Sequence, residues 1–179
     1  MKLYLLSGPC GCGKTTLSNA FARHLVDEGG QNQVYVIHGD DFHAGFAETA
    51  KRVGPSCPGF LYWADILSFI WECILSTADK ALRRGLDVVI DYVVEDELPL
   101  VMDLAQQHGA ELCYGVLTAG ESHIRQRLTQ RGDPGLIDRA LFLKQKLETM
   151  PENQGQVIDT SGKTVEQLVV ALKEMFDRK

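Results

Sequence analysis

The segment Gly8–Thr15, with the sequence GPCGCGKT, restricts the fold of this chain more than any other stretch. It matches the pattern G-x-x-x-x-G-K-[ST], whose glycines let successive backbone N–H groups point into one concavity that cradles phosphate oxygens. The apolar run 3–6 precedes it and a helical pattern follows, so a helix N-terminus would also face the anion. We therefore expect a nucleoside triphosphate site; the alternative is an ordinary glycine-rich turn between a strand and a helix.

Two side chains of this segment have chemistry that suits ATP bound with magnesium. The Lys14 ammonium can place a positive charge on the β and γ oxygens, and the Thr15 hydroxyl can ligate Mg²⁺. ATP and Mg²⁺ are thus the expected cofactors. The residues expected to contact the nucleotide here are Gly8, Pro9, Cys10, Gly11, Cys12, Gly13, Lys14, Thr15 and Thr16.

Short apolar runs alternate with helical periods along the rest of the chain. The runs that read as strands are 3–6, 34–37, 88–90, 112–117 and 157–158, and helical patterns lie between them. Such alternation implies right-handed βαβ crossovers and a parallel sheet covered on both faces. We expect one α/β domain over residues 1–179. Residues 44–59 show no period and contain glycines and prolines, which predicts a long loop of the kind that is often functional.

Composition excludes several classes of protein. Hydrophobic residues make up 45% of the 179, enough for one well-filled core. The net charge of -6 lacks the basic excess of a nucleic-acid-binding protein, so nucleic acid is an unlikely partner. The five cysteines form no disulfide framework, and Cys10 and Cys12 read as small residues that suit a tight loop. No run approaches a membrane span, so we expect a cytoplasmic location.

Acidic residues follow two of the expected strands. Asp40 and Asp41 come after the second strand and Asp91 after the third, where carboxylates would share an edge of the sheet with the phosphate loop. Asp40 can orient or deprotonate an acceptor hydroxyl, and Asp91 can ligate magnesium. Asp41 is as readily a helix cap or turn residue, and Asp91 could cap the next segment. His43 reads as a substrate contact or a bystander.

Arginines gather around the turn 133–135. Arg125, Arg127, Arg131 and Arg139 lie on the two flanking helical segments, and an arginine-bearing helix pair at about 121–149 is typical of a closing lid. Arg127 and Arg131 are four residues apart and share a helix face. The alternative is a solvated surface.

Thr160 and Ser161 follow the last expected strand. A small polar loop there could contact the adenine edge, although a plain connection capped by Thr164 explains it equally well.

The whole chain resembles the small P-loop kinases that include shikimate kinase, gluconate kinase, adenylylsulfate kinase and chloramphenicol phosphotransferase, and it is most similar to short gluconate-kinase-like members. The resemblance rests on the segments 8–15, 39–40, 89–91, 125–139 and 159–161. It implies a P-loop NTPase three-layer sandwich, with a five-stranded parallel sheet in the order 2-3-1-4-5 and a helical lid. It also implies that Asp40 is the base and that Arg131 and Arg139 meet the ATP phosphates. The chain departs from shikimate kinases, whose D-x-D is replaced here by adjacent Asp40 and Asp41.

The expected function is ATP-dependent phosphoryl transfer to a hydroxyl of a small molecule. Lys14, Asp40, Arg131 and Arg139 are the expected catalytic residues, and Asp40, His43 and Arg52 the expected substrate contacts. Two alternatives stay open: a nucleotide or nucleic-acid 5′-end kinase, and a regulatory ATPase without an acceptor. Neither the acceptor nor the oligomeric state has a signal in the sequence.

Overall fold

The protein is built around a single parallel sheet with the strand order β2-β3-β1-β4-β5. The computed structural model describes residues 1–29, 33–46 and 61–178. The strands are β1 (Lys2–Ser7), β2 (Val34–His38), β3 (Asp87–Asp91), β4 (Glu111–Thr118) and β5 (Val157–Asp159). All four strand pairs are parallel. The predicted strands and their order are therefore confirmed.

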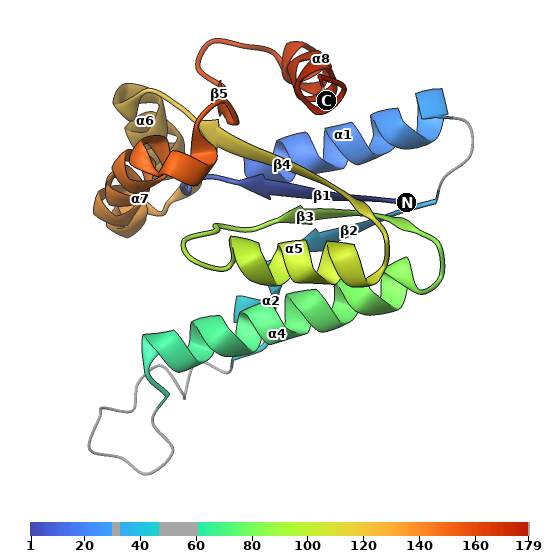
Figure 1. The fold of residues 1–179 in the computed structure, drawn as a ribbon. Helices are drawn as coiled ribbons and strands as arrows, with labels where there is room; N and C mark the ends of the chain where they lie inside the picture. The colour runs from blue at the N-terminus through green and yellow to red at the C-terminus, as the bar shows by residue number, and fades with distance from the viewer. Residues whose placement is uncertain (30–32, 47–60, 179) are drawn as a thin grey trace.

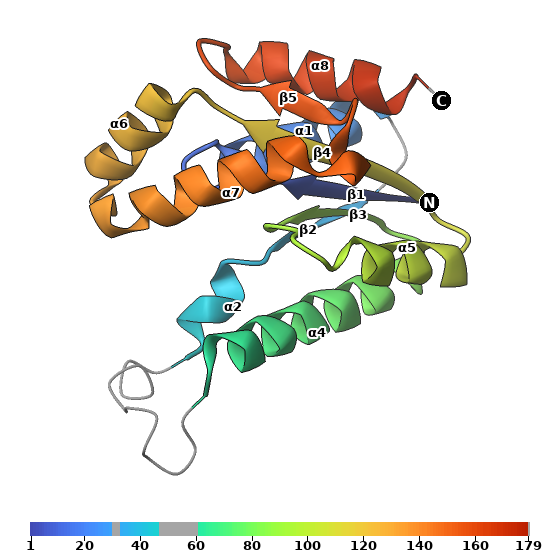
Figure 2. The same ribbon diagram turned by 60° about the vertical axis from the view of Figure 1, so that its left-hand side comes forward.

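Helices cover both faces of the sheet. They are α1 (Lys14–Gly29), α2 (Asp41–Ala44), α4 (Trp63–Leu82), α5 (Leu98–Gln107), α6 (Glu121–Arg131), α7 (Ile137–Thr149) and α8 (Val165–Phe176), with the 3-10 turns η1 (Pro134–Leu136) and η2 (Pro151–Asn153). In Figure 1, α1 and α8 lie on one face and α4 and α5 on the other. The α6–α7 hairpin extends beyond the carboxyl end of β1 (Figures 1 and 2), which is the place expected of the lid.

Successive side chains of β1 point to opposite faces of the sheet, which explains the two halves of the core. Leu3 and Leu5 pack toward α4 and α5, whereas Tyr4 and Leu6 pack toward α1 and α8. Because both faces are covered, the strand reads as a continuous apolar run rather than an alternating one. A separate cluster of Ala119, Ile124, Leu128 and Ala140 is formed largely by α6 and α7.

Short elements near the site were not predicted. Residues 41–44 form the one-turn helix α2, with Asp40 at its cap position and Asp41 in its first turn. The Asp40 side chain makes no capping hydrogen bond to this helix. The rest of the expected loop, from residue 47 onward, lies outside the described residues. No helix among the described residues is long and apolar enough to cross a membrane.

Gly39 sets the position of Asp40, and its replacement has a predictable cost. The Gly39 N–H donates to the Asp91 carbonyl at 3.0 Å, and a Cβ at Gly39 would lie 2.4 Å from the Tyr92 ring. Gly39→Ala should therefore lower the free energy of unfolding by about 1–3 kcal/mol in chemical denaturation, since the core must shift. Gly45→Ala is the control, because a Cβ there would meet only the Phe42 carbonyl oxygen, at 3.5 Å. Equal losses in the two variants would contradict this account.

Candidate active site

The glycine-rich segment forms a tight loop between β1 and α1. Gly8, Gly11 and Gly13 have φ angles of 145°, 79° and 98°, a backbone region that favours glycine. At Gly8 a Cβ would also lie 2.3 Å from the Leu117 carbonyl oxygen. The loop therefore needs glycine for both its turn and its close approach to β4, as the phosphate-loop pattern predicted.

The Lys14 side chain folds back over this loop. Its Nζ donates hydrogen bonds to the carbonyls of Gly8, at 2.8 Å, and Pro9, at 3.2 Å. Burial lowers the pKa of Lys14, but nearby cysteine and aspartate side chains raise it to a net value above the usual one. Lys14 is thus a buried cation, satisfied by neutral carbonyls that a phosphate could replace as its partners.

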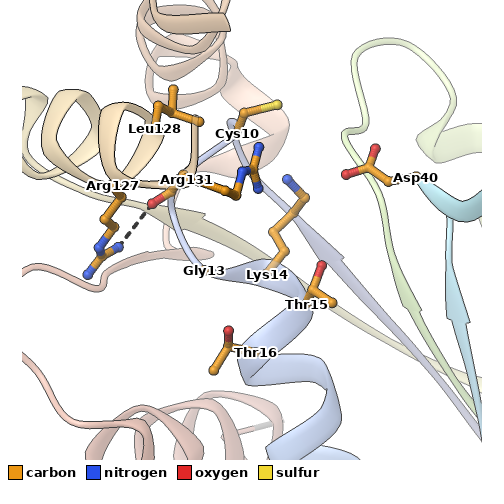
Figure 3. A pocket seen from close by; sticks show the side chains of 10 residues that line it. Cys10, Gly13, Lys14, Thr15, Thr16, Asp40, Arg127, Leu128 and Arg131 are labelled. Carbon is orange, nitrogen blue, oxygen red and sulfur yellow. Dashed lines mark hydrogen bonds between the residues drawn. The ribbon is translucent and has the colours of Figure 1, made fainter. Parts of the chain in front are cut away.

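A cavity of about 190 Å³ opens above the loop. It is lined by Cys10, Gly11, Gly13, Lys14, Thr15, Thr16, Asp40, Arg127, Leu128 and Arg131. Figure 3 shows Lys14 and Arg131 on one side of the opening and Asp40 on the other. The structure therefore joins three of the four predicted catalytic residues, and it places cations opposite a carboxylate.

Of the arginines around the turn 133–135, Arg127 and Arg131 reach this cavity. Arg127 donates to the Gly11 carbonyl at 3.1 Å and to the Thr160 hydroxyl at 3.2 Å, while Arg131 pairs with Asp133 at 2.5 Å. The sequence placed Arg127 on the same helix face as Arg131, four residues away. The resemblance, however, assigned the phosphate contacts to Arg131 and Arg139.

Arg139 lies elsewhere in this structure. It forms an ion pair with Glu95 and lies over the Phe142 ring, with 5.3 Å between its guanidinium carbon and the ring centroid. It lines a second cavity, of about 520 Å³, together with Trp63, Leu67, Glu95, Asp96 and Glu97. Lys146 also pairs with Glu95, at 3.1 Å. The expected contact of Arg139 with an ATP phosphate stays a prediction.

Asp91 lies directly behind Thr15. The Thr15 hydroxyl is 3.4 Å from Asp91 Oδ1, and Asp91 is 1% exposed. Burial raises the pKa of the Asp91 carboxyl above its usual value, and hydrogen bonds from Ser18 and His38 partly offset that effect. A hydroxyl and a carboxylate beside a phosphate loop are oxygen donors that fit Mg²⁺. Sequence reasoning missed Ser18, although it lies one helical turn after Lys14.

The two loop cysteines differ in environment. Cys12 is buried, and burial raises the pKa of its thiol above the usual value, so it packs as a small apolar residue. Cys10 is half-buried at the edge of the cavity and packs against the apolar cluster of α6 and α7. Cys12 therefore has the structural role that the sequence suggested.

Thr160 and Ser161 connect loops of the protein. The buried Thr160 hydroxyl donates to the Cys12 carbonyl at 2.9 Å, and the Ser161 hydroxyl accepts from the Gly120 N–H at 2.7 Å. Their expected contact with adenine stays a prediction.

Loss of the Thr160 hydroxyl should loosen the phosphate loop. Thr160→Val keeps the side-chain shape but leaves the Cys12 carbonyl without this donor, at an expected cost of about 1–3 kcal/mol in the free energy of unfolding. Thr160→Ser keeps the hydroxyl and is the control. Denaturant titration measures both variants, and a valine variant as stable as the serine variant would argue against the hydrogen bond.

His43 lies beside the second cavity. Its Nε2 is 2.8 Å from the Tyr92 hydroxyl, and its ring stacks on Trp63 with centroids 5.5 Å apart. A substrate contact from His43 is compatible with this position and stays a prediction. Arg52, the other expected substrate contact, lies outside the described residues.

The sheet order, the glycine loop with its lysine, and the carboxylate behind Thr15 define a P-loop NTPase. The chain belongs to the AAA domain family, whose sequence model matches residues 3–153. No curated protein sequence matches it significantly.

Solved structures share this fold over nearly the whole chain. The APS kinase CysC of Mycobacterium tuberculosis, in complex with AMPPNP and APS, is 15% identical, with a TM-score of 0.68 over 98% of this chain and 97% of that one. A gluconokinase from Sinorhizobium meliloti 1021 is 16% identical, with a TM-score of 0.63 over 99% of this chain and 92% of that one. A tunicamycin resistance protein of Deinococcus radiodurans is also 16% identical, with a TM-score of 0.64 over 97% and 94% of the two chains. The expected resemblance to P-loop kinases is confirmed at the level of the fold.

Proposed function

We propose that this protein is a kinase that transfers the γ-phosphate of ATP to a hydroxyl group of a small molecule. The observation that carries the proposal is the placement of Asp40 across one cavity from Lys14 and Arg131 (Figure 3). The two cations suit the phosphates of the donor, and the carboxylate suits the hydroxyl of an acceptor.

The proposed reaction assigns one task to each group. The loop amides and Lys14 hold the β and γ phosphates, and Thr15 and Asp91 would hold magnesium. Bound magnesium would neutralise charge on the phosphate oxygens. Asp40 accepts the proton of the acceptor hydroxyl as its oxygen bonds to the γ-phosphorus and the bond to the leaving ADP oxygen breaks. Arg131 stabilises the charge that develops on the transferring group.

The second cavity is the proposed location of the acceptor. Its wall includes Trp63, which stacks on His43, and His43 lies three residues after Asp40. The same wall includes Arg139 of α7. The wall offers an exposed aromatic face, the Arg139–Glu95 pair, and the carboxylates of Asp96 and Glu97. An aromatic face flanked by hydrogen-bonding charges suits a small polar molecule with several hydroxyl groups.

A panel of candidate acceptors tests the proposal. Sugars and sugar acids, shikimate, nucleosides, aminoglycosides and chloramphenicol would each be incubated with ATP, Mg²⁺ and the protein, and ADP release measured. We expect at least one compound to raise ADP release in the wild type and not in Asp40→Asn. ADP release that no compound stimulates would contradict the assignment and favour an ATPase without an acceptor.

The alternative of a nucleic-acid 5′-end kinase has less support. A polynucleotide needs a basic groove, whereas the chain carries a net charge of -6 and the second cavity is lined by three carboxylates and one arginine. Transfer of labelled γ-phosphate to an oligonucleotide would favour this alternative.

A further inference from the structure

The carboxylate of Asp91 is held by side chains from two other elements. Its Oδ2 lies 2.5 Å from the Ser18 hydroxyl of α1 and 2.5 Å from His38 Nδ1, at the end of β2. Its Oδ1 lies 3.4 Å from the Thr15 hydroxyl. The two carboxylate oxygens therefore have different tasks: Oδ2 is occupied by Ser18 and His38, and Oδ1 faces the phosphate loop.

The backbone strengthens the link between His38 and Asp91. The two residues are paired in the parallel ladder of β2 and β3, and the Gly39 N–H donates to the Asp91 carbonyl at 3.0 Å. Asp40 follows Gly39 directly. The strand end that presents the proposed base is thus joined to the strand end that presents the magnesium-facing carboxylate.

We propose that His38 is a positioning residue for magnesium. Its Nδ1 fixes the rotation of the Asp91 carboxylate so that Oδ1 points toward Thr15, the place where both would ligate the ion. The Ser18 hydroxyl of α1 bonds the same oxygen. With Ser18 as its single partner, however, the carboxylate could still rotate about that hydrogen bond. Partners of this kind, which contact the ligand rather than the metal, typically account for about 10- to 100-fold in metal affinity.

The choice of side chain makes the proposal testable. Asparagine carries an amide nitrogen at nearly the place of the imidazole Nδ1, so His38→Asn can keep the hydrogen bond to Asp91. His38→Leu and His38→Ala both remove this hydrogen bond, and the new side chains differ in volume. Either variant tests the proposal, provided that it folds. A matched control is His108→Ala, which removes a histidine that bonds Asp79 at 2.9 Å outside the site.

The experiment measures ADP binding by calorimetry with and without Mg²⁺, together with Mn²⁺ binding by electron paramagnetic resonance. It deepens the proposed function but needs no acceptor and no turnover, so its failure is distinguishable from failure of the kinase assignment. We expect His38→Leu or His38→Ala to weaken the binding of Mg²⁺–ADP and of Mn²⁺ by about 10- to 100-fold. Metal-free ADP binding should change little, and His38→Asn should recover most of the metal effect. The His108→Ala protein should match the wild type.

Three results would overturn the proposal. One is an unchanged magnesium effect in a folded variant that lacks the donor, and another is an equal loss of metal-free and metal-dependent binding. A folded His38→Asn protein that binds Mg²⁺–ADP no better than the leucine or alanine variant would also contradict it.

Discussion

Lys14→Ala is expected to lower phosphoryl transfer by about 10³-fold, to the limit of detection in an ordinary ADP-release assay. Lys14 is a buried ammonium whose present partners are the carbonyls of Gly8 and Pro9. When ATP binds, the β and γ oxygens would take over as partners, and charge on them grows in the transition state. Alanine removes that stabilisation where solvent screening is weakest.

Two further variants separate charge from size at this position. Lys14→Met keeps a long flexible side chain without the charge and should be as inactive as Lys14→Ala. Lys14→Arg keeps the charge, but its planar guanidinium does not replace a compact ammonium in a tight loop, so it should recover little activity. Unfolding curves of all three variants would show whether the hydrogen bonds from Lys14 to the Gly8 and Pro9 carbonyls also contribute to the stability of the protein. Turnover of Lys14→Ala within tenfold of the wild type would contradict the role of Lys14.

Asp40→Asn should lower kcat by about 10²- to 10⁴-fold, the usual contribution of a general base, and leave ATP affinity nearly unchanged. Asp40 is exposed in the cavity and does not cap α2 through its side chain. The substitution therefore removes a proton acceptor without removing a capping hydrogen bond. Asn has almost the same shape as Asp. A fall in kcat without a rise in the ATP dissociation constant is therefore the expected pattern.

The neighbouring residue provides the matched control for Asp40. Asp41 is also an exposed carboxylate, in the first turn of α2, and it does not line the phosphate-loop cavity. Asp41→Asn changes the net charge equally and should retain most of the activity. Steady-state kinetics and nucleotide titration measure both variants, and a fully active Asp40→Asn protein would remove Asp40 from the mechanism.

Much of the fold could be read from local patterns, because the strands are buried runs and glycines end several helices. The phosphate loop was predictable from its residues, since Gly8, Lys14 and Thr15 are constrained by a single chemical task. The sheet order came from the resemblance to P-loop kinases, because alternation of elements fixes their type and not their neighbours.

Side-chain partners distant in sequence were harder to predict. Arg139 pairs with Glu95, 44 residues away, and this contact depends on how α7 packs beside the loop after β3. His38 meets Asp91 only because β2 and β3 pair in a particular register. Spacing along one helix could have suggested Ser18 and Arg127 as site residues. A contact between two strand ends leaves no local pattern in the sequence.

The fate of the γ-phosphate tests the central proposal most directly. ATP labelled at the γ position would be incubated with Mg²⁺, the protein and an acceptor that stimulates ADP release, and the labelled products separated. We expect the label to leave ATP in a phosphate ester of the acceptor, in equal amount to the ADP formed, and Asp40→Asn to abolish this transfer. Recovery of the label only as inorganic phosphate, with or without the acceptor, would contradict it.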